Sequence, residues 1–281
     1  MDRLAFDPHG VKQHGLVYTA LSRVRDIKSL YLINKLQPTN FSISHKVVCE
    51  MERLRTESCY QFHYGIHSKP NNNFLLISCL NTRSLSLHIE HIANDHDLMN
   101  ADILCLQETN TNIHPKDILL STKYNYLSIF HLHGIFTYYN KNIVLEKSYN
   151  YTAKHIESIV ASFKIRTLSL KLANVYIAPN TPLEDVFDFV ASILKNAHPK
   201  EHILLASDFN IDMSTNANDQ QKFISFMNNN NFTLHMKTTT CNTGSVLDHF
   251  WTNLYNQNIE FAISEAYWTD HDAIYLSIPL H

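Results

Sequence analysis

The chain has 281 residues, of which 44% are hydrophobic and 17% are charged, with a formal net charge of −3. This balance is typical of a globular chain with one large core, or with a core domain and an appendage, and it excludes fibres and wholly disordered chains. The densest apolar run, Phe74 to Leu80, is far shorter than the ~18 residues of a membrane span. Because the start of the chain also lacks the apolar segment of a secretory signal, we expect an intracellular protein, located in the nucleus, with no membrane contact.

Cysteine and glycine usage excludes two further classes of site. The five cysteines are odd in number and never form a Cys-x-x-Cys pair, which favours reduced, packed thiols over disulfides or zinc ligands. None of the five glycines precedes a lysine, so the chain lacks the Gly-Lys-Ser/Thr loop that cradles nucleotide phosphates. We therefore expect no ATP to be bound by this chain alone.

Charge is distributed unevenly along the chain. Residues 1–69 hold ten Lys and Arg against six Asp and Glu, whereas the remainder holds 13 against 20, so the two parts carry net charges of +4 and −7. Excess acid is usually a solvated face, but carboxylates are also the ligands of divalent cations. Charge alone leaves both interpretations open.

The first predicted elements form a unit of their own. Short apolar runs cover Tyr18–Val24 and Ser29–Leu36, and Val47–Arg55 is an amphipathic stretch with helical character. After residue 55 the composition turns to Ser, His, Tyr, Lys and Asn, which is typical of a linker. We divide the chain into residues 1–60, a linker at 61–73 and a domain at 74–281. Because the first part has few apolar side chains, we expect partial disorder there.

From residue 74 onward, strand-like and helix-like segments alternate. The predicted helices are Ser84–Met99, Leu183–Asn196 and Asp219–Asn230. The predicted strands are Phe74–Leu80, Asp102–Leu106, Tyr126–Phe130, Ile135–Tyr139, Glu157–Lys164, Leu168–Ile177, His202–Ala206, Val246–Thr252, Ile259–Ala266 and Ala273–Pro279. Strands mixed with covering helices over this length predict a two-sheet α/β sandwich.

Polar side chains gather where these predicted strands begin or end. Because sites in sheets with helical cover form at strand ends, these blocks are expected to converge on one face. The blocks are Asn81, Gln107-Glu108-Thr109, Ser207-Asp208-Phe209-Asn210, Asp248-His249 and Thr269-Asp270-His271. Of these, Asp248-His249 lies inside its predicted strand.

The chemistry of this set is that of hard oxygen ligands with one imidazole. Mg²⁺ and Mn²⁺ prefer oxygen ligands such as those of Asn81, Glu108 and Asp270. Zinc sites usually contain more His or Cys ligands. Asp208 could activate a water, with Asn210 holding the geometry. His271 could donate to a phosphoryl oxygen if Asp248 fixed its ring. The pattern therefore favours metal-assisted phosphodiester hydrolysis.

Six motifs in order resemble the endonuclease/exonuclease/phosphatase superfamily over residues 74–281. The resemblance implies a four-layer α/β sandwich with divalent-metal phosphodiesterase activity. The motifs are Asn81, Leu106-Gln107-Glu108-Thr109, Val175-Tyr176-Ile177-Ala178-Pro179-Asn180, Ser207-Asp208-Phe209-Asn210, Leu247-Asp248-His249 and Thr269-Asp270-His271.

The resemblance also implies roles for individual residues. Asn81, Glu108 and Asp270 would serve the metal, and Tyr176 and Asn180 the phosphate. By the same resemblance, the pair Asp208 and Asn210 would handle the nucleophilic water, and Asp248 would orient His271. Two positions depart from the family pattern: Ser207 replaces the usual Gly, and the spacing from Tyr176 to Asn180 is one residue longer than the commonest form.

Within the superfamily, two segments look most like the endonuclease domains of retrotransposons and related abasic-site endonucleases. These are Gln107-Glu108-Thr109 and Ser245-Val246-Leu247-Asp248-His249. In that group the hydroxyl residues before the Asp, here Thr243 and Ser245, would contact the DNA backbone. The implied substrate is DNA, cut by nicking or at abasic sites.

Residues 1–60 resemble a different family. The run from His14 to Arg25 and the following Leu30-Tyr31-Leu32 are similar to the C-terminal motif of RecD/Pif-type helicases, in which the Arg matching Arg23 reaches a nucleotide phosphate. All other helicase motifs are missing, so this small helicase-tail segment is interpreted as a remnant. The combination suggests a fragment of a Helitron-type transposon protein.

Alternative interpretations stay open at this point. Asn81 could be a turn residue, Glu108 a helix-terminal acid, Asp208 or Asn210 a cap, and Tyr176 a packed aromatic. Two other functions also fit: a hydrolase of phosphoinositides or other small phosphodiesters, and a catalytically silent relic that only binds nucleic acid. Of the two histidines, His271 is the better site candidate, because His249 is expected to face away from Asp248 within a strand.

Overall fold

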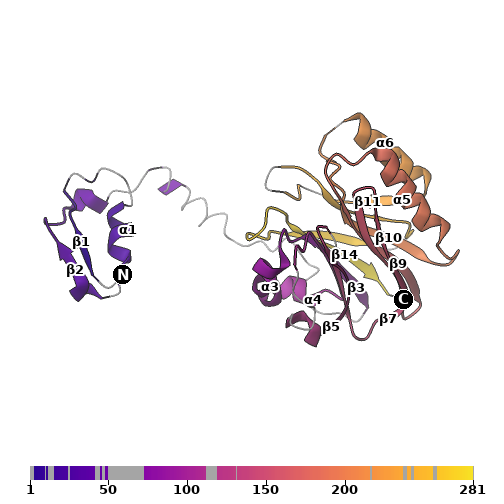
Figure 1. Ribbon diagram of the computed structural model, residues 1–281, viewed down its shortest axis with the longest axis horizontal. Coiled ribbons are helices and arrows are strands. Elements are labelled where there is room, and N and C mark those ends of the chain that lie inside the picture. The colour runs from indigo at the N-terminus through magenta and orange to yellow at the C-terminus, as the bar shows by residue number, and fades with distance from the viewer. Residues whose placement is uncertain are drawn as a thin grey trace. The chain divides into compact units, whose positions relative to one another are not determined.

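The computed structural model describes residues 3–9, 11, 16–24, 26–41, 45, 48–49, 73–111, 119–130, 132–215, 217–236, 239–241, 244–255 and 258–280. The chain forms two compact units, residues 1–62 and 63–281 (Figure 1). The predicted linker at 61–73 lies outside the described residues except for Asn73.

The first unit is built from short elements. Strands β1 (Leu4–Phe6) and β2 (Leu30–Leu32) pair in parallel, and helix α1 (Leu16–Ser22) lies between them in the sequence. Pro8 and Val17 are the two buried side chains among the residues described in this unit. With so little apolar surface removed from water, hydrophobic burial contributes little to holding this unit together.

The second unit contains two six-stranded mixed sheets, which we call sheet I and sheet II. In sheet I the strand order is β11-β12-β10-β9-β8-β7, and in sheet II it is β13-β14-β3-β4-β6-β5. The pairs β9–β10 and β3–β4 are parallel, and the remaining pairs are antiparallel. The strands of sheet I are β7 (Val144–Ala153), β8 (Ile156–Ile165), β9 (Leu168–Ile177), β10 (His202–Asp208), β11 (Thr233–His235) and β12 (Asp248–Thr252). Those of sheet II are β3 (Phe74–Asn81), β4 (Ile103–Gln107), β5 (Tyr124–Ile129), β6 (Ile135–Asn140), β13 (Glu260–Ser264) and β14 (Ala273–Pro279).

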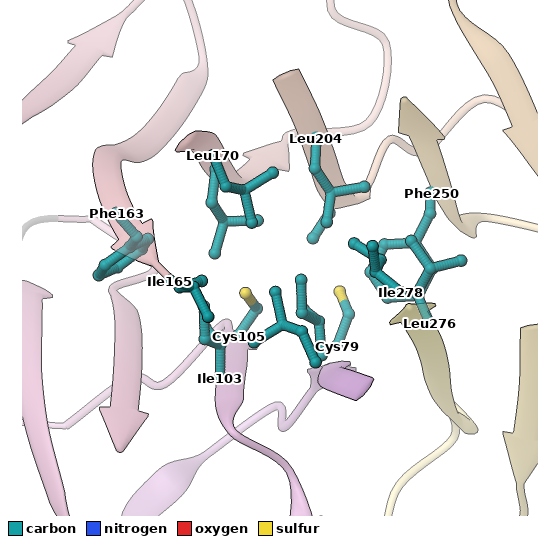
Figure 2. Close-up of a cluster of buried hydrophobic side chains, with 14 of the residues drawn as sticks. Cys79, Ile103, Cys105, Phe163, Ile165, Leu170, Leu204, Phe250, Leu276 and Ile278 are labelled. Atoms are coloured by element: carbon teal, nitrogen blue, oxygen red, sulfur yellow. The ribbon is translucent and has the colours of Figure 1, made fainter. Parts of the chain in front are cut away.

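Three buried apolar layers hold the sheets and helices together. Between the sheets, Leu170 and Leu204 of sheet I face Cys79, Cys105 and Leu276 of sheet II (Figure 2). On the outer face of sheet I, helices α5 (Leu183–Lys195) and α6 (Asn218–Asn229) bury their apolar sides. On the outer face of sheet II, α3 (Leu85–Asn94) and α4 (His96–Asn100) do the same. The four layers confirm the predicted α/β sandwich.

Strand periodicity explains why both faces of each sheet are buried. In β9, Leu170 and Leu172 belong to the layer between the sheets, whereas Ala173 and Val175 belong to the layer under the helices. Successive side chains of a strand point to opposite faces, so a strand covered on both sides reads as a nearly continuous apolar run.

The structure corrects several predicted elements. The single helix expected over Ser84–Met99 is two helices, because the Asp95 carboxylate accepts from the backbone N–H groups of Asp97 and Leu98 and starts α4 there. Strand β7 was not predicted, since it is an exposed edge strand rich in polar residues. Similarly, β12 begins at Asp248 rather than at residue 246, and residues 269–271 precede β14 instead of opening it.

No helix in the described part of the chain is both long and apolar enough to cross a bilayer.

Candidate active site

The candidate site lies at one end of the layer between the two sheets. Along each strand, the positions that face this layer carry apolar side chains in the middle of the strand and polar side chains at its end. In β10 the inward positions run from Leu204 through Ala206 to Asp208, and in β3 they run from Cys79 to Asn81. The same alternation places Gln107, Tyr176 and Asp248 at inward positions of β4, β9 and β12. All five of these polar side chains are buried.

Asn81 joins the two sheets at the centre of this cluster. Its Nδ2 donates to Glu108 Oε1 at 2.7 Å and to Asp208 Oδ2 at 2.9 Å, and its Oδ1 accepts from the backbone N–H of Arg83 at 3.0 Å. The Arg83 N–H fixes which end of the amide carries oxygen. Asn81 thus bridges two carboxylates through its nitrogen. The role of Asn81 as an oxygen ligand for a metal stays a prediction.

Arg83, which the sequence analysis missed, contacts two of the predicted site residues. Its Nε and Nη2 donate to the Asp270 carboxylate at 3.0 and 2.7 Å, and its Nη1 lies 3.9 Å from Glu108 Oε2. Burial opposes ionisation of Asp270, but the hydrogen bond and charge of Arg83 lower the pKa of this carboxyl. The guanidinium brings a positive charge to the two carboxylates predicted to bind a metal. A lone arginine two residues after a strand-end asparagine carries no sequence signal for this role.

Asp208 and Asn210 are positioned by the end of β10. Asp208 Oδ1 accepts from the backbone N–H of Asn210 at 3.1 Å, and the Asn210 side chain donates to the carbonyl of Ile177 at 2.7 Å. Asn210 itself has a left-handed φ of 50°, a conformation that asparagine tolerates better than most residues. Burial, followed by the nearby negative charge of Asp248, raises the pKa of Asp208 to about 7.

Asp248 and His271 form a buried pair next to Asp208. The distance between Asp248 Oδ2 and His271 Nδ1 is 2.7 Å. Burial disfavours the imidazolium, but the charge and hydrogen bond of Asp248 outweigh it and raise the pKa of His271 to about 11. His271 Nε2 lies 4.0 Å from Oδ1 of Asp270, a predicted metal ligand. His249 faces the opposite way, as predicted: its ring stacks on Phe209 under the helices, and burial lowers its pKa to about 3.

The loop that carries Glu108 is held by the buried carboxylate of Glu157. Glu157 of β8 accepts from the backbone N–H groups of His133 and Gly134, both at 3.0 Å. The carbonyls of these two residues accept from Asn110 N and Thr109 N at 2.8 and 3.1 Å. Glu108 precedes them with a left-handed φ of 44°. Gly134, with a φ of 81°, has no room for a side chain, because an added Cβ would lie 2.5 Å from Thr109 Oγ1.

Glu157→Ala is expected to lower the free energy of unfolding by about 1–3 kcal/mol, because the buried N–H of Gly134 and the half-buried N–H of His133 lose their acceptors. Urea unfolding monitored by circular dichroism measures this change. Glu146→Ala, on the exposed face of the edge strand β7, is the matched control and should cost less than about 0.5 kcal/mol. Equal unfolding free energies for the two variants would show that Glu157 does not hold the loop.

Tyr176 adjoins Glu108 and Asp208, the carboxylates predicted to serve the metal and the nucleophilic water. Its ring lies 4.7 Å from that of His133. Burial, then the negative charges of Glu108 and Asp208, raise the pKa of the phenol well above its usual range. The hydroxyl therefore remains a hydrogen-bond donor at neutral pH.

The predicted substrate-binding residues Asn180 and Ser245 make no described hydrogen bond to this cluster. Asn180 is exposed in the turn after β9, with a φ of 63°, and no hydrogen bond of the described residues joins it to the cluster. Ser245 is half-buried, and its carbonyl accepts from the backbone N–H groups of Thr240 and Cys241. Thr243 lies outside the described residues. Ser207 needs no positive φ, and its Oγ donates to the carbonyl of Val175, so the change from the usual glycine causes no strain.

Comparisons with known proteins agree with this architecture. A family model described as "Endonuclease-reverse transcriptase" matches residues 170–275. The human Nocturnin catalytic domain has a similar structure, with a TM-score of 0.59 at 15% identity, covering 77% of this chain and 97% of that one. An endonuclease/exonuclease/phosphatase family protein from Bacteroides thetaiotaomicron aligns with a TM-score of 0.58 at 12% identity, covering 74% and 98%. The chain has the endonuclease/exonuclease/phosphatase fold.

Two further structures with the endonuclease/exonuclease/phosphatase fold align over nearly their whole length. The endonuclease domain of TRAS1, a telomere-specific non-LTR retrotransposon, gives a TM-score of 0.56 at 12% identity, covering 74% of this chain and 99% of that one. Truncated Caenorhabditis elegans TDP2 gives 0.53 at 14% identity, covering 75% and 100%. A comparison with curated protein sequences gives no match.

Proposed function

We propose that this chain is a divalent-metal-dependent phosphodiesterase that cuts DNA, either by nicking or at abasic sites. The observation that carries the proposal is the meeting of an acidic pair, Glu108 and Asp270, with Asp208 and the Asp248–His271 pair at one end of the sandwich. Such a set supplies a cation site, a proton acceptor and a hydrogen-bond donor within one small volume.

The donor set at Glu108 and Asp270 fits Mg²⁺ or Mn²⁺. Both ligands are carboxylates, and the structure already satisfies them with a cation, the Arg83 guanidinium. The side chain of Arg83 is 53% exposed, so it is free to turn away when a metal ion takes its place. When bound, the ion would stabilise the negative charge that develops on the phosphoryl group.

The other residues provide a proton acceptor and two hydrogen-bond donors. Asp208, with a pKa near neutrality, is suited to accept the proton of an attacking water. His271, held by Asp248, presents its Nε2–H to a phosphoryl oxygen. The hydroxyl of Tyr176 is a second donor for the phosphate.

Two aromatic rings near the site, exposed Tyr267 and half-buried Trp268, favour a nucleic acid over a small phosphodiester. The Trp268 ring stacks on that of His91 at 5.7 Å, and Tyr267 is 81% exposed with its ring 6.1 Å from that of His91. Trp268 lies two residues before Asp270, a span of at most about 7 Å along the chain. Aromatic side chains at such a distance provide stacking surfaces for nucleobases that flank the cut.

A single activity experiment separates the candidate functions. Purified chain is incubated with intact plasmid, plasmid containing abasic sites and phosphoinositide vesicles, each with Mg²⁺, Mn²⁺ or EDTA. Metal-dependent cleavage of either plasmid supports the proposal. Preferential cleavage of the phosphoinositide would favour the small-substrate hydrolase, and inactivity of the folded chain on all three would favour the silent relic.

Metal binding is also expected to stabilise the fold. At a Mg²⁺ concentration about tenfold above its Kd, the melting temperature should rise by about 3–6 °C. Differential scanning fluorimetry measures this shift. Glu108→Gln should abolish it, whereas Glu184→Gln, an exposed carboxylate at the start of α5, should leave it unchanged. Arg83→Met removes the competing cation, so its melting temperature should rise at lower Mg²⁺ concentrations. A Mg²⁺-dependent shift that survives in Glu108→Gln would contradict the proposed metal site.

We further propose that residues 1–60 are a remnant of a RecD/Pif-type helicase and that the chain derives from a Helitron-type transposon. The support is the sequence motif around Arg23, which follows α1, together with the similarity of residues 170–275 to the endonuclease-reverse transcriptase family. Since the phosphate loop is missing from the sequence, no ATP turnover is expected. DNA-stimulated ATP hydrolysis by the purified chain would contradict the remnant interpretation.

A further inference from the structure

A second cluster of potential metal ligands lies behind His271, away from the carboxylates proposed to bind Mg²⁺. Cys241 Sγ lies 3.4 Å from His271 Nδ1 and 3.8 Å from Asp248 Oδ2, and these two last atoms are 2.7 Å apart. The three side chains offer a thiolate, an imidazole nitrogen and a carboxylate oxygen within 4.8 Å of one another. An isolated β-bridge between Cys241 and His271 fixes their relative position.

The spacing is close to that of a zinc site. With the usual zinc–ligand distances, tetrahedral geometry sets S···N and S···O separations of about 3.6 Å and an N···O separation of about 3.4 Å. The two distances from Cys241 already lie within about 0.2 Å of these values. The Asp248–His271 separation of 2.7 Å would have to open by about 0.7 Å, as the hydrogen bond gives way to two metal bonds.

The donor chemistry separates this cluster from the neighbouring one. Glu108 and Asp270 offer oxygen alone, which suits Mg²⁺ and Mn²⁺. Sulfur and imidazole nitrogen select softer ions, and Zn²⁺ binds such sets with a fourth position left to water. The two adjoining clusters at this end of the sandwich thus suit different metal ions.

We propose that Cys241, Asp248 and His271 form a Zn²⁺ site and that Zn²⁺ bound there inhibits the enzyme by replacing the Asp248–His271 hydrogen bond that directs Nε2–H toward the substrate. The inhibitory half rests on the proposed function, whereas the binding half does not. Zn²⁺ replaces the thiol proton and the proton shared by Asp248 and His271, so it leaves no uncompensated charge in this buried place. Cys241 and His271 are buried, with 8% and 4% of their surface exposed.

Cobalt spectroscopy tests the binding half without any activity measurement. Co²⁺ coordinated by a thiolate gives a near-ultraviolet charge-transfer band, and tetrahedral Co²⁺ gives strong visible bands. The titration uses the full chain carrying Cys49→Ser and Cys59→Ser, because exposed Cys49 lies 3.5 Å from His45 and could bind metal on its own. Buried Cys79 and Cys105 remain in every variant.

The expected result is one equivalent of Co²⁺ with thiolate and tetrahedral bands, displaced by Zn²⁺ and lost when Cys241→Ser is added. Cys241→Ala repeats the comparison, and circular dichroism confirms that the variants are folded. Absence of the bands from the parent, or their persistence in both Cys241 variants, would overturn the proposed site.

The inhibitory half is tested by cleavage at constant Mg²⁺ with increasing Zn²⁺. The Zn²⁺ concentration for half inhibition should rise at least tenfold when Cys241→Ser is added to the Cys49→Ser and Cys59→Ser parent. Equal inhibition of the two proteins would place the inhibitory ion elsewhere. If the chain cleaves no phosphodiester, the proposed function fails while the cobalt result still decides the binding site.

Discussion

Asp208→Asn is expected to lower kcat for DNA cleavage by about 10²–10⁴-fold, the range typical of a lost general base. The substitution keeps the size of the side chain and the acceptor for the Asn210 N–H, but it removes the charge that would draw a proton from water. It also relieves the repulsion between Asp208 and Asp248, so we expect the melting temperature to stay the same or rise. Steady-state cleavage of a labelled abasic duplex measures the change.

Asp219→Asn is the matched control for this prediction. Asp219 is an exposed carboxylate in the first turn of α6, and its replacement should leave kcat unchanged. A folded Asp208→Asn variant that keeps full activity would remove Asp208 from the proposed site. A loss of activity accompanied by unfolding would instead show that Asp208 is needed for structure.

The largest expected effect on stability comes from a buried ion pair far from the candidate site. Lys171 Nζ lies 3.0 Å from Glu201 Oε2, with side chains only 1% and 3% exposed. Glu201 also accepts from Ser162 Oγ and from the backbone N–H of His198. Burial raises the pKa of Glu201, but these hydrogen bonds and Lys171 together lower it overall. Glu201→Ala is expected to cost about 3–5 kcal/mol, because it leaves a buried ammonium without its partner.

Urea unfolding measures this effect, and a second substitution tests its cause. Adding Lys171→Met to Glu201→Ala should recover part of the lost stability by removing the uncompensated charge. If the double variant is no more stable than Glu201→Ala, the cost lies in the hydrogen bonds of Ser162 and His198. Lys154, which pairs with Asp185 and Asp188 on the surface, provides the comparison: Lys154→Met should cost less than about 1 kcal/mol.

Sequence patterns predicted the fold well where apolar periodicity was strong. Strands β9 and β14 have the predicted bounds, because each is a long apolar run covered on both faces. Strand β7 was missed because an exposed edge strand shows no such run. The break between α3 and α4 was missed because it depends on one aspartate cap within an otherwise helical pattern.

The candidate site was predictable only for residues that end a strand or belong to an ordered motif. Asn81 and Asp208 lie at strand ends, where the strand-end argument placed them. Asp248 was expected inside a strand, but it is the first residue of β12. Contacts such as those of Arg83 and Glu157 join segments far apart in the sequence, and no local pattern marks them. The direction of the Asn81 amide was also beyond sequence analysis, since it is set by the backbone N–H of Arg83.

The alternation of inward and outward positions limits how this domain can change during evolution. Asp208 points between the sheets, and its neighbours Ser207 and Phe209 belong to the other face, with Phe209 packed under the helices. Inserting or deleting one residue within β10 would exchange these faces, burying a carboxylate beneath α6 and placing a phenyl ring among the site residues. Length variation in related sequences should therefore be confined to the loops that join the strands. Within the strands of the site, substitutions should be accepted far more readily than single-residue insertions.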